Sequence, residues 1–217
     1  MIVNERVSCY IASLTTYNSD FLEELRERAL EDKVPIIKRE TESFLKTLLL
    51  LKKPKKILEV GTAVAYSSLV MAEVLEGKTK ISTIENYEKR VLEARKNIAD
   101  SNYSNIIYLI EEDASRVLKE LVEKEEKYDF IFMDAAKGQY INWLEPVIKL
   151  LNKEGVLCSD NVLQGGDIVQ SRYLVERRDR SIHSRLREYL YELTHREELS
   201  TTILSLGDGV ALTVLKK

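Results

Sequence analysis

The stretch ILEVGTAVAYS, residues 57–67, decides the fold. It begins with an apolar run, Ile57 to Val60, and continues through a glycine and several small residues into a helical pattern near 67–75. A buried strand that leads through a tight turn into a helix is the basic unit of a doubly wound α/β sheet. Gly61 permits close approach of a ligand to the backbone, and the small residues after it leave room for that ligand to lie across the turn.

The same alternation of apolar runs and amphipathic stretches continues along the chain. Strands are predicted over 57–60, 80–84, 106–110, 130–133 and 156–159, with helices near 67–75, 87–99, 115–122 and 140–151. This alternation is typical of parallel strands joined by crossover helices. A helix over about 178–196 is then followed by strand-like runs at 200–205 and 210–215, and Asp208-Gly209 between them favours a tight hairpin. We therefore predict a seven-stranded, mostly parallel sheet that ends in an antiparallel hairpin.

Three helices are predicted before the sheet. Two precede about Asp32, the second starting at Asp20 with Glu23 at capping-box spacing, and the third runs over about 41–51. The pair Val34-Pro35 separates them, because the residue before proline avoids helical angles. No repeat or linker divides the 217 residues, so we expect one domain, 1–217, with a helical extension, 1–53, packed on it.

Composition restricts the compartment and the chemistry. The apolar runs are far shorter than the roughly 20 residues of a membrane span, and no basic stretch followed by an apolar block opens the chain, so we expect a cytoplasmic protein without a membrane partner. Cys9 and Cys158 are far apart, which argues against a disulfide or a thiolate zinc site, and both are predicted to be inert packing residues. The net charge of −3 does not favour a general nucleic-acid binder.

Polar residues follow the predicted strands at the edge where doubly wound sheets bind ligands. Glu85 follows the second strand, where an acid can hold both ribose hydroxyls, and Asp113-Ala114 follow the third, where they can border an adenine ring. The alternative is that Glu59 and Glu85 are solvated charges and that Gly61 only makes a turn. A nicotinamide dehydrogenase would use the same edge, but the turn lacks Gly-x-Gly-x-x-Gly, so methyl transfer is favoured over hydride transfer.

Three residues with oxygen donors follow the fourth and fifth predicted strands, at the same edge of the sheet. Asp134 comes after the fourth predicted strand, and Asp160 and Asn161 come after the fifth. Two carboxylates and an amide, without a nearby His or Cys, suit Mg²⁺ or another hard divalent cation better than zinc. Helix caps or hydrogen-bonded strand ends are the alternative for the two aspartates. A cation that binds a hydroxyl and its neighbouring oxygen lowers the pKa of that hydroxyl, so we expect a substrate with a vicinal oxygen pair.

Several segments resemble the catechol and caffeoyl-coenzyme A O-methyltransferase family. They are VPI at 34–36, ILEVGTA at 57–63, YS at 66–67, DAAK at 134–137 and SDNV at 159–162. The resemblance spans almost the whole chain and implies a Rossmann-like class I methyltransferase fold, S-adenosylmethionine (SAM) as cofactor, and a homodimer. One departure is Ala65, where the family usually has glycine, so a positive φ at this position would strain the turn.

The resemblance also implies the roles of individual residues. Cofactor contacts are expected from Val34, Glu59, Gly61, Thr62, Ala63, Tyr66, Ser67, Glu85, Asp113, Ala114 and Asp134. Asp134, Asp160 and Asn161 are the expected cation ligands, and Asp134 and Lys137 the expected catalytic residues. Lys137 matches the family lysine that helps to remove the proton from the acceptor. A solvated surface lysine is the alternative.

Within the family, DAAKGQY at 134–140, DNVL at 160–163 and GDG at 207–209 look most like the bacterial tRNA 5-hydroxyuridine methyltransferases. This resemblance implies SAM- and Mg²⁺-dependent methylation of 5-hydroxyuridine at the wobble position to 5-methoxyuridine, with the tRNA anticodon loop as partner. The alternatives are methylation of small catechol or caffeoyl-CoA-like phenols, and a non-catalytic cofactor-binding interaction module.

Two features bear on the RNA hypothesis. Arginines that can contact phosphates concentrate after the fifth strand, at positions 172, 177, 178, 180, 185 and 187, although a salt-bridged interface helix would carry them equally well. Tyr140 and Trp143 are candidates to stack on a flipped-out base, and Trp143 can equally belong to the core.

Overall fold

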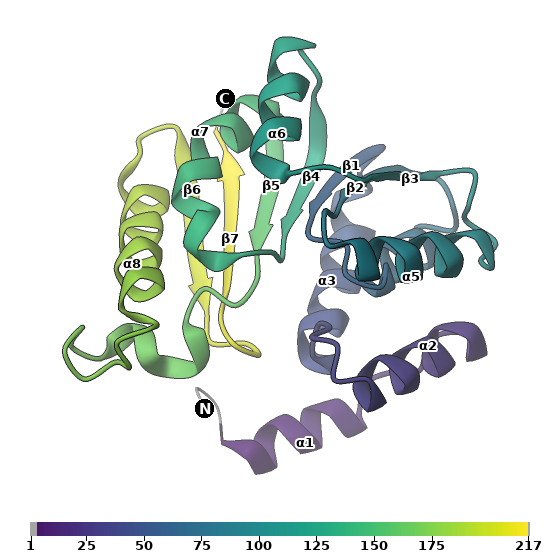
Figure 1. The fold of residues 1–217 in the computed structure, drawn as a ribbon, viewed down its shortest axis with the longest axis horizontal. Helices are drawn as coiled ribbons and strands as arrows, with labels where there is room; N and C mark the ends of the chain where they lie inside the picture. Colours follow the sequence, from purple (N-terminus) through teal and green to yellow (C-terminus); the bar gives the residue numbers. More distant parts are fainter. Residues whose placement is uncertain (1–3, 217) are drawn as a thin grey trace.

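The computed structural model describes residues 4–216, and its centre is a seven-stranded sheet (Figure 1). The strands are β1 (Lys56–Val60), β2 (Lys80–Ile84), β3 (Ile107–Ile110), β4 (Tyr128–Met133), β5 (Leu151–Ser159), β6 (Leu199–Leu204) and β7 (Val210–Leu215). Their order is β3-β2-β1-β4-β5-β7-β6. Strands β1 to β5 pair in parallel, whereas β7 is antiparallel to both β5 and β6. The predicted α/β sheet with a terminal hairpin is confirmed.

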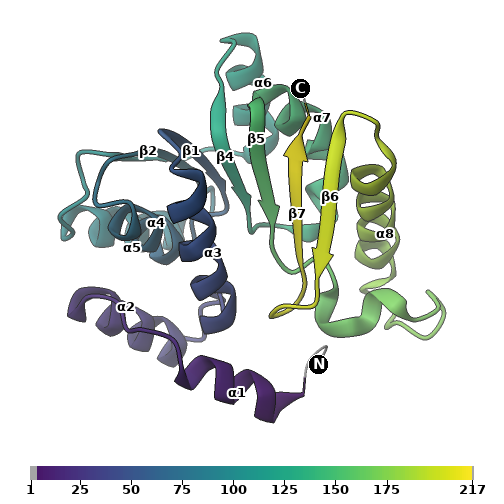
Figure 2. The ribbon, with the colours of Figure 1, turned by 180° about the vertical axis from the view of Figure 1, so that it is seen from behind.

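Helices cover both faces of this sheet, as Figures 1 and 2 show from opposite sides. On one face lie α3 (Arg39–Lys52), α4 (Tyr66–Val74) and α5 (Glu88–Ala99), and on the other lie α6 (Ala114–Glu123), α7 (Tyr140–Leu150) and α8 (Arg180–His195). Two short 3₁₀ segments, η1 (Lys137–Gln139) and η2 (Gln164–Val169), follow β4 and β5. Two further helices, α1 (Glu5–Ser13) and α2 (Asp20–Glu31), precede α3.

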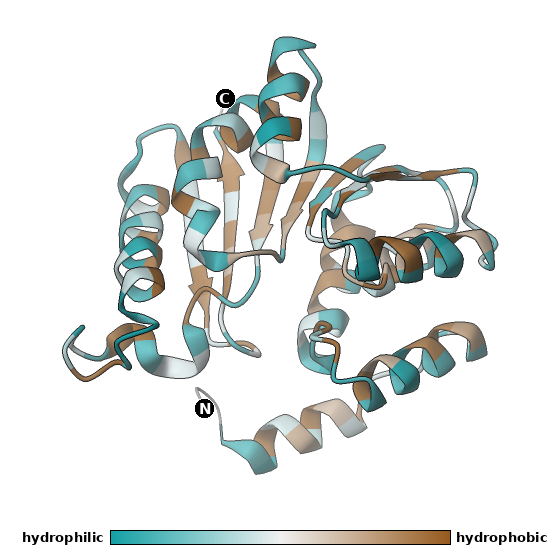
Figure 3. Cartoon of the chain, viewed as in Figure 1, coloured by the Kyte–Doolittle hydropathy of each residue, from teal (hydrophilic) through white to brown (hydrophobic). Residues whose placement is uncertain are grey.

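Alternate side chains of each strand enter two separate cores. In β4, Phe130 and Phe132 pack on the α3–α5 side, while Ile131 and Met133 pack on the α6–α8 side, and all four are fully buried. In Figure 3 the strands are largely hydrophobic, whereas the helices that cover them carry both hydrophilic and hydrophobic stretches. Strands buried on both faces read as continuous apolar runs, which explains why the sequence predicted them.

The carboxyl-terminal hairpin differs in detail from the prediction. Strand β7 lies between β5 and β6, so the last strand of the chain is internal and β6 forms the edge. The connection, residues 205–209, is longer than a two-residue turn, and it contains Gly207 and Gly209 at φ 57° and 95°. Because β6 runs parallel to β5, this connection lies at the carboxyl edge of the sheet, where the candidate site residues are.

The amino-terminal helices differ more. The N-cap of α2 is Ser19, and Glu23 accepts a hydrogen bond from the backbone N–H of Asn18 at 2.9 Å, so the capping box predicted from Asp20 does not form. No residue of α1 is buried, and Cys9 on this helix is exposed, so its predicted packing role is wrong, whereas Cys158 is buried in β5. Among residues 4–216, no helix is long and apolar enough to cross a membrane.

Candidate active site

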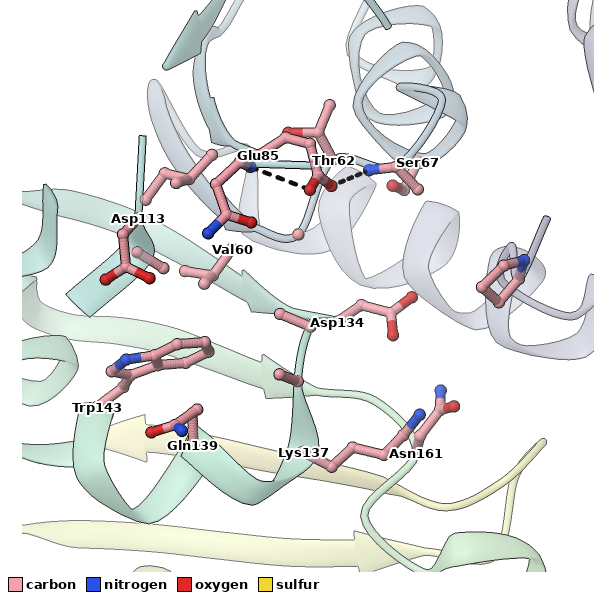
Figure 4. Close-up of a pocket in the computed structure, with 18 of the residues that line it drawn as sticks. Val60, Thr62, Ser67, Glu85, Asp113, Asp134, Lys137, Gln139, Trp143 and Asn161 are labelled. Carbon is pink, nitrogen blue, oxygen red and sulfur yellow. Dashed lines mark hydrogen bonds between the residues drawn. The ribbon is translucent and has the colours of Figure 1, made fainter. Parts of the chain in front are cut away.

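A cavity of about 530 Å³ opens at the carboxyl edge of the sheet (Figure 4). This volume lies within the roughly 300–1,000 Å³ that small-molecule sites occupy. The predicted site residues that line it are Gly61, Thr62, Ala63, Tyr66, Ser67, Glu85, Asp113, Ala114, Asp134, Lys137 and Asn161. Residues 35–37, which precede α3, contribute a further wall. The structure therefore brings together residues that follow β1, β2, β3, β4 and β5.

The turn between β1 and α4 is pressed against the ends of its neighbouring strands. The N–H groups of Gly61 and Thr62 donate to the Ile84 carbonyl at 3.1 and 3.2 Å. Gly61 has φ 102°, and a Cβ atom there would lie 2.1 Å from the carbonyl oxygen of Asp134. Only glycine fits this position, both because of its backbone angle and because of the space available.

Ala65 keeps the left-handed conformation that glycine adopts more easily. Its φ is 65°, and that of Ala63, in the same turn, is 47°. A left-handed conformation costs an L-residue about 1–2 kcal/mol. The methyl group of Ala65 is fully buried, and the side chain of Asn97 donates to the Val64 carbonyl at 2.9 Å. These contacts hold the turn in a conformation that is strained at Ala65, as predicted for a residue other than glycine.

Glu85 is fixed by three backbone N–H groups. One carboxylate oxygen accepts from Ala63 at 2.9 Å, and the other accepts from Asn86 and Tyr87 at 3.0 Å each. A carboxylate has about four acceptor positions, so one remains for a ribose hydroxyl. Binding both hydroxyls requires Glu85 to release a backbone donor. Asp113 also has a structural partner, because it caps α6 by accepting from the Ser115 N–H at 2.9 Å.

Two residues predicted to contact the cofactor do not line the cavity. Glu59 is fully buried behind the turn, where it accepts hydrogen bonds from the hydroxyls of Ser67, Ser68 and Thr83. Burial raises the pKa of Glu59 to about 7, although these donors oppose the shift. Val34 is buried in the hydrophobic core, and the residues after it form the wall instead. Both therefore support the site from behind.

The predicted cation ligands follow β4 and β5 at the carboxyl edge of the sheet. The Asp134 N–H donates to the Val60 carbonyl at 3.0 Å and the Asp160 N–H to the Met133 carbonyl at 2.9 Å, so both aspartates directly follow paired strands. Asp134 and Asn161 line the cavity, whereas Asp160 is 2% exposed and lies behind it.

The electrostatics around these residues suit a cation. Burial, and then the charge of Asp134, raise the pKa of Asp160 to about 7, while its hydrogen bond from the Asn161 N–H opposes the shift. Burial also raises the pKa of Asp134, against the opposing charge of Lys137. Two carboxylates that repel each other beside a cavity would be stabilised by a divalent cation. Within residues 4–216 no group of three or more His, Cys, Asp or Glu side chains forms a metal cluster, so the candidate ligands are two carboxylates and one amide.

Asp208 is a charged neighbour that the sequence interpretation missed. It lies in the β6–β7 connection, and its charge raises the pKa of both Asp134 and Asp160. Its carboxylate accepts from Lys38 Nζ at 2.8 Å, which links the connection to the start of α3. The sequence indicated Asp208 as a hairpin residue and as part of the GDG segment that carries the resemblance, but not as a neighbour of the site, because the position of β7 beside β5 could not be read from it.

The two aromatic residues proposed for base stacking have different positions. Tyr140 is fully buried, and its hydroxyl lies 3.1 Å from the Met133 carbonyl and 3.2 Å from the Ala135 N–H. It braces the end of β4, so the stacking prediction is wrong for Tyr140. Trp143 lines the cavity, with its indole N–H donating to Ser115 Oγ at 3.0 Å. Figure 4 shows Trp143 and Asp113 on the side opposite Asn161.

Comparison with known proteins agrees with this geometry. A model of the O-methyltransferase family matches residues 12–217. The chain belongs to the O-methyltransferase family. A catechol O-methyltransferase from Niastella koreensis is 30% identical to this O-methyltransferase over 168 residues, which cover 76% of each chain.

Solved structures share the whole fold of this O-methyltransferase. A Staphylococcus aureus protein that carries the provisional name caffeoyl-CoA O-methyltransferase has a TM-score of 0.89 and 31% identity, covering 97% of this chain and 100% of its own. A Bacillus cereus O-methyltransferase in complex with SAH has a TM-score of 0.84 and 25% identity, covering 97% of both chains. The predicted SAM-dependent O-methyltransferase is thus confirmed, whereas the tRNA substrate, the cation and the homodimer stay predictions.

Proposed function

We propose that this O-methyltransferase transfers the methyl group of SAM to one hydroxyl of a vicinal pair on a small catechol-type phenol. The observation that carries the proposal is the convergence of Asp134, Lys137 and Asn161 at one end of the cavity, in front of the buried Asp160. The catechol O-methyltransferase of N. koreensis supports this acceptor class, which was the alternative to tRNA in the sequence interpretation.

The cofactor residues divide the cavity. The turn from Gly61 to Ser67 would hold the methionine part of SAM, and Glu85 would accept from its ribose. Asp113 and Trp143 border the far side, where the adenine would lie. When bound, SAM supplies an electrophilic methyl group, so the protein must mainly orient the acceptor oxygen and take its proton.

The opposite end prepares the acceptor. Asp134, Asp160 and Asn161 would hold Mg²⁺ or another divalent cation, which lowers the pKa of a hydroxyl bound beside a second oxygen. Lys137 lines this end, and its charge faces the Asp134 carboxylate. In the proposed reaction, Lys137 would take the hydroxyl proton as a general base after its own ammonium group has released a proton to solvent.

An acceptor series tests the proposal. The purified enzyme is incubated with SAM, Mg²⁺ and one acceptor: catechol, resorcinol or phenol. We expect mass spectrometry to show the gain of one methyl group on catechol, and little product from resorcinol or phenol, because neither has a vicinal oxygen pair. Equal rates with all three would reject the role of the vicinal pair. No product from any of them would reject phenols as acceptors.

A second candidate is the 5-hydroxyuridine of tRNA. The arginines within residues 172–187 mostly lack carboxylate partners: Arg180 donates to the carbonyls of Tyr173 and Val175, and Arg185 donates to that of Gly138 in η1. Arg178 is the exception in this segment, because it pairs with neighbouring acids. Positive charge beside η1 supports a polyanionic acceptor.

The same preparation can test the tRNA candidate. Incubation with tRNA that carries 5-hydroxyuridine should convert that nucleoside to 5-methoxyuridine, as seen by nucleoside mass spectrometry. If catechol is methylated and this tRNA is not, the tRNA candidate is rejected. The arginines at 172–187 then have a role other than tRNA binding.

A further inference from the structure

A buried carboxylate lies behind the cavity, in the first turn of α3. Glu42 is 2% exposed, and one of its oxygens accepts from the Tyr66 hydroxyl at 2.6 Å. Its other oxygen accepts from the side chain of Asn18, in the α1–α2 connection, at 2.8 Å. Arg26 of α2 approaches the carboxylate at 3.5 Å, and Arg39 and Lys46 of α3 approach it at 3.4 and 3.9 Å, so cations offset its charge. Glu42 therefore joins the amino-terminal helices to α4.

Tyr66 connects this network to the cavity. It is the first residue of α4, it lines the cavity beside the β1–α4 turn, and it is 1% exposed. Burial and the nearby charge of Glu42 raise the pKa of the Tyr66 hydroxyl, so it stays protonated and donates to Glu42. If Glu42 is removed, this buried hydroxyl loses its acceptor, and only core packing and the hydrogen bond from Asn18 at 3.3 Å still hold the side chain.

The network also holds a second part of the cavity wall. The guanidinium of Arg26 that approaches Glu42 donates to the Ile37 carbonyl at 3.0 Å. Ile37 belongs to the segment 35–37, which lines the cavity before α3 begins. Glu42 thus fixes two walls, Tyr66 directly and Ile37 through Arg26.

We infer that Glu42 is a positioning residue for the cofactor: through Tyr66 and Arg26 it sets the spacing of two cavity walls, and it thereby makes the amino-terminal extension part of the SAM site. When the cavity walls are already fixed before the cofactor binds, less free energy of binding is lost to the ordering of side chains and backbone. The inference rests on SAM occupying this cavity and is independent of the acceptor, so a test with SAH alone separates it from the choice between phenol and tRNA.

The test measures SAH dissociation constants by calorimetry, below the unfolding temperature of every variant. Glu42→Gln leaves one neutral acceptor oxygen for donors that now share two charged ones, and it should raise the constant about tenfold, which corresponds to the loss of one hydrogen bond to a charged group. Tyr66→Phe should raise it by less, because Arg26 and Ile37 keep their positions. The double variant should match Glu42→Gln, since both substitutions weaken the same contact. With saturating SAM, kcat should change less than twofold, so the effect lies in KM.

Asp129→Asn is the matched control. The Asp129 carboxylate accepts from the N–H groups of Lys55 and Lys56 at 2.9 and 3.1 Å, at the amino end of the sheet and away from the cavity. This variant should lower the unfolding temperature and leave the SAH constant unchanged. An SAH constant within twofold of wild type for Glu42→Gln would overturn the inference. If Glu42→Gln does not fold, Tyr66→Phe decides alone, and an unchanged constant for it overturns the inference equally.

Discussion

Substitution of Gly61 by alanine should damage both stability and the site. The new Cβ atom would meet the Asp134 carbonyl oxygen at 2.1 Å, about 1.3 Å inside the 3.4 Å at which ordinary contact begins. The positive φ costs about 1–2 kcal/mol, and forcing extra volume into a packed position costs about 1–3 kcal/mol more. We therefore expect Gly61→Ala to lower the free energy of unfolding by about 3 kcal/mol.

The same substitution should impair catalysis beyond its effect on stability. Relief of the clash moves the backbone of Asp134, and a displacement of about 1 Å in a catalytic group can cost about 100-fold in rate. Urea denaturation gives the change in unfolding free energy. SAH calorimetry and catechol methylation, measured on the folded fraction, give the change at the site.

Gly77→Ala separates the clash from the backbone angle. Gly77 also has a positive φ, 69°, but a Cβ atom there would meet nothing closer than the Tyr103 ring at 3.8 Å. This variant should lose only about 1 kcal/mol and keep wild-type activity. If Gly61→Ala proved as stable and as active as Gly77→Ala, the close packing of the turn against Asp134 would be refuted.

Three further predictions concern single features. Lys137→Met should lower kcat by about 100-fold or more and leave the SAH dissociation constant unchanged, as steady-state kinetics and calorimetry would show. Folded Glu59 has a pKa of about 7 and keeps a proton that the unfolded chain releases. Unfolding free energy should therefore fall by on the order of 3 kcal/mol as pH rises from about 4.5 to 7, and Glu59→Gln should flatten this slope in urea titrations. Light scattering should give about twice the chain mass of 25.0 kDa if the proposed homodimer forms, and Leu14→Glu, at the exposed apolar residue that follows α1, should halve it.

Strand positions and most site residues could be predicted from the sequence. Strands buried on both faces leave continuous apolar runs, and the residues that follow them must gather at the carboxyl edge of a parallel sheet. Gly61, Glu85, Asp134 and Asn161 were located by this rule alone, and the structure places all four on one cavity.

Other features depend on contacts that a sequence pattern does not contain. Asp208 reaches the site only because β7 inserts beside β5, and strand order cannot be read from apolar runs. Tyr140 and Trp143 lie in the same helix, yet one braces β4 and the other lines the cavity. Cys9 was predicted as a packing residue, but within residues 4–216 no residue of α1 is buried, which leaves Cys9 exposed.

The cation dependence of methyl transfer to catechol tests the central claim most directly. The initial rate is measured after treatment with EDTA, and again after Mg²⁺ is restored, for the wild type and for Asp160→Asn. We predict that chelation lowers the wild-type rate at least about 100-fold and that Mg²⁺ restores it. Asp160→Asn should stay inactive with Mg²⁺ while it still binds SAH. A wild-type rate that persists in EDTA, or an Asp160→Asn variant as active as the wild type, would contradict a cation site formed by Asp134, Asp160 and Asn161.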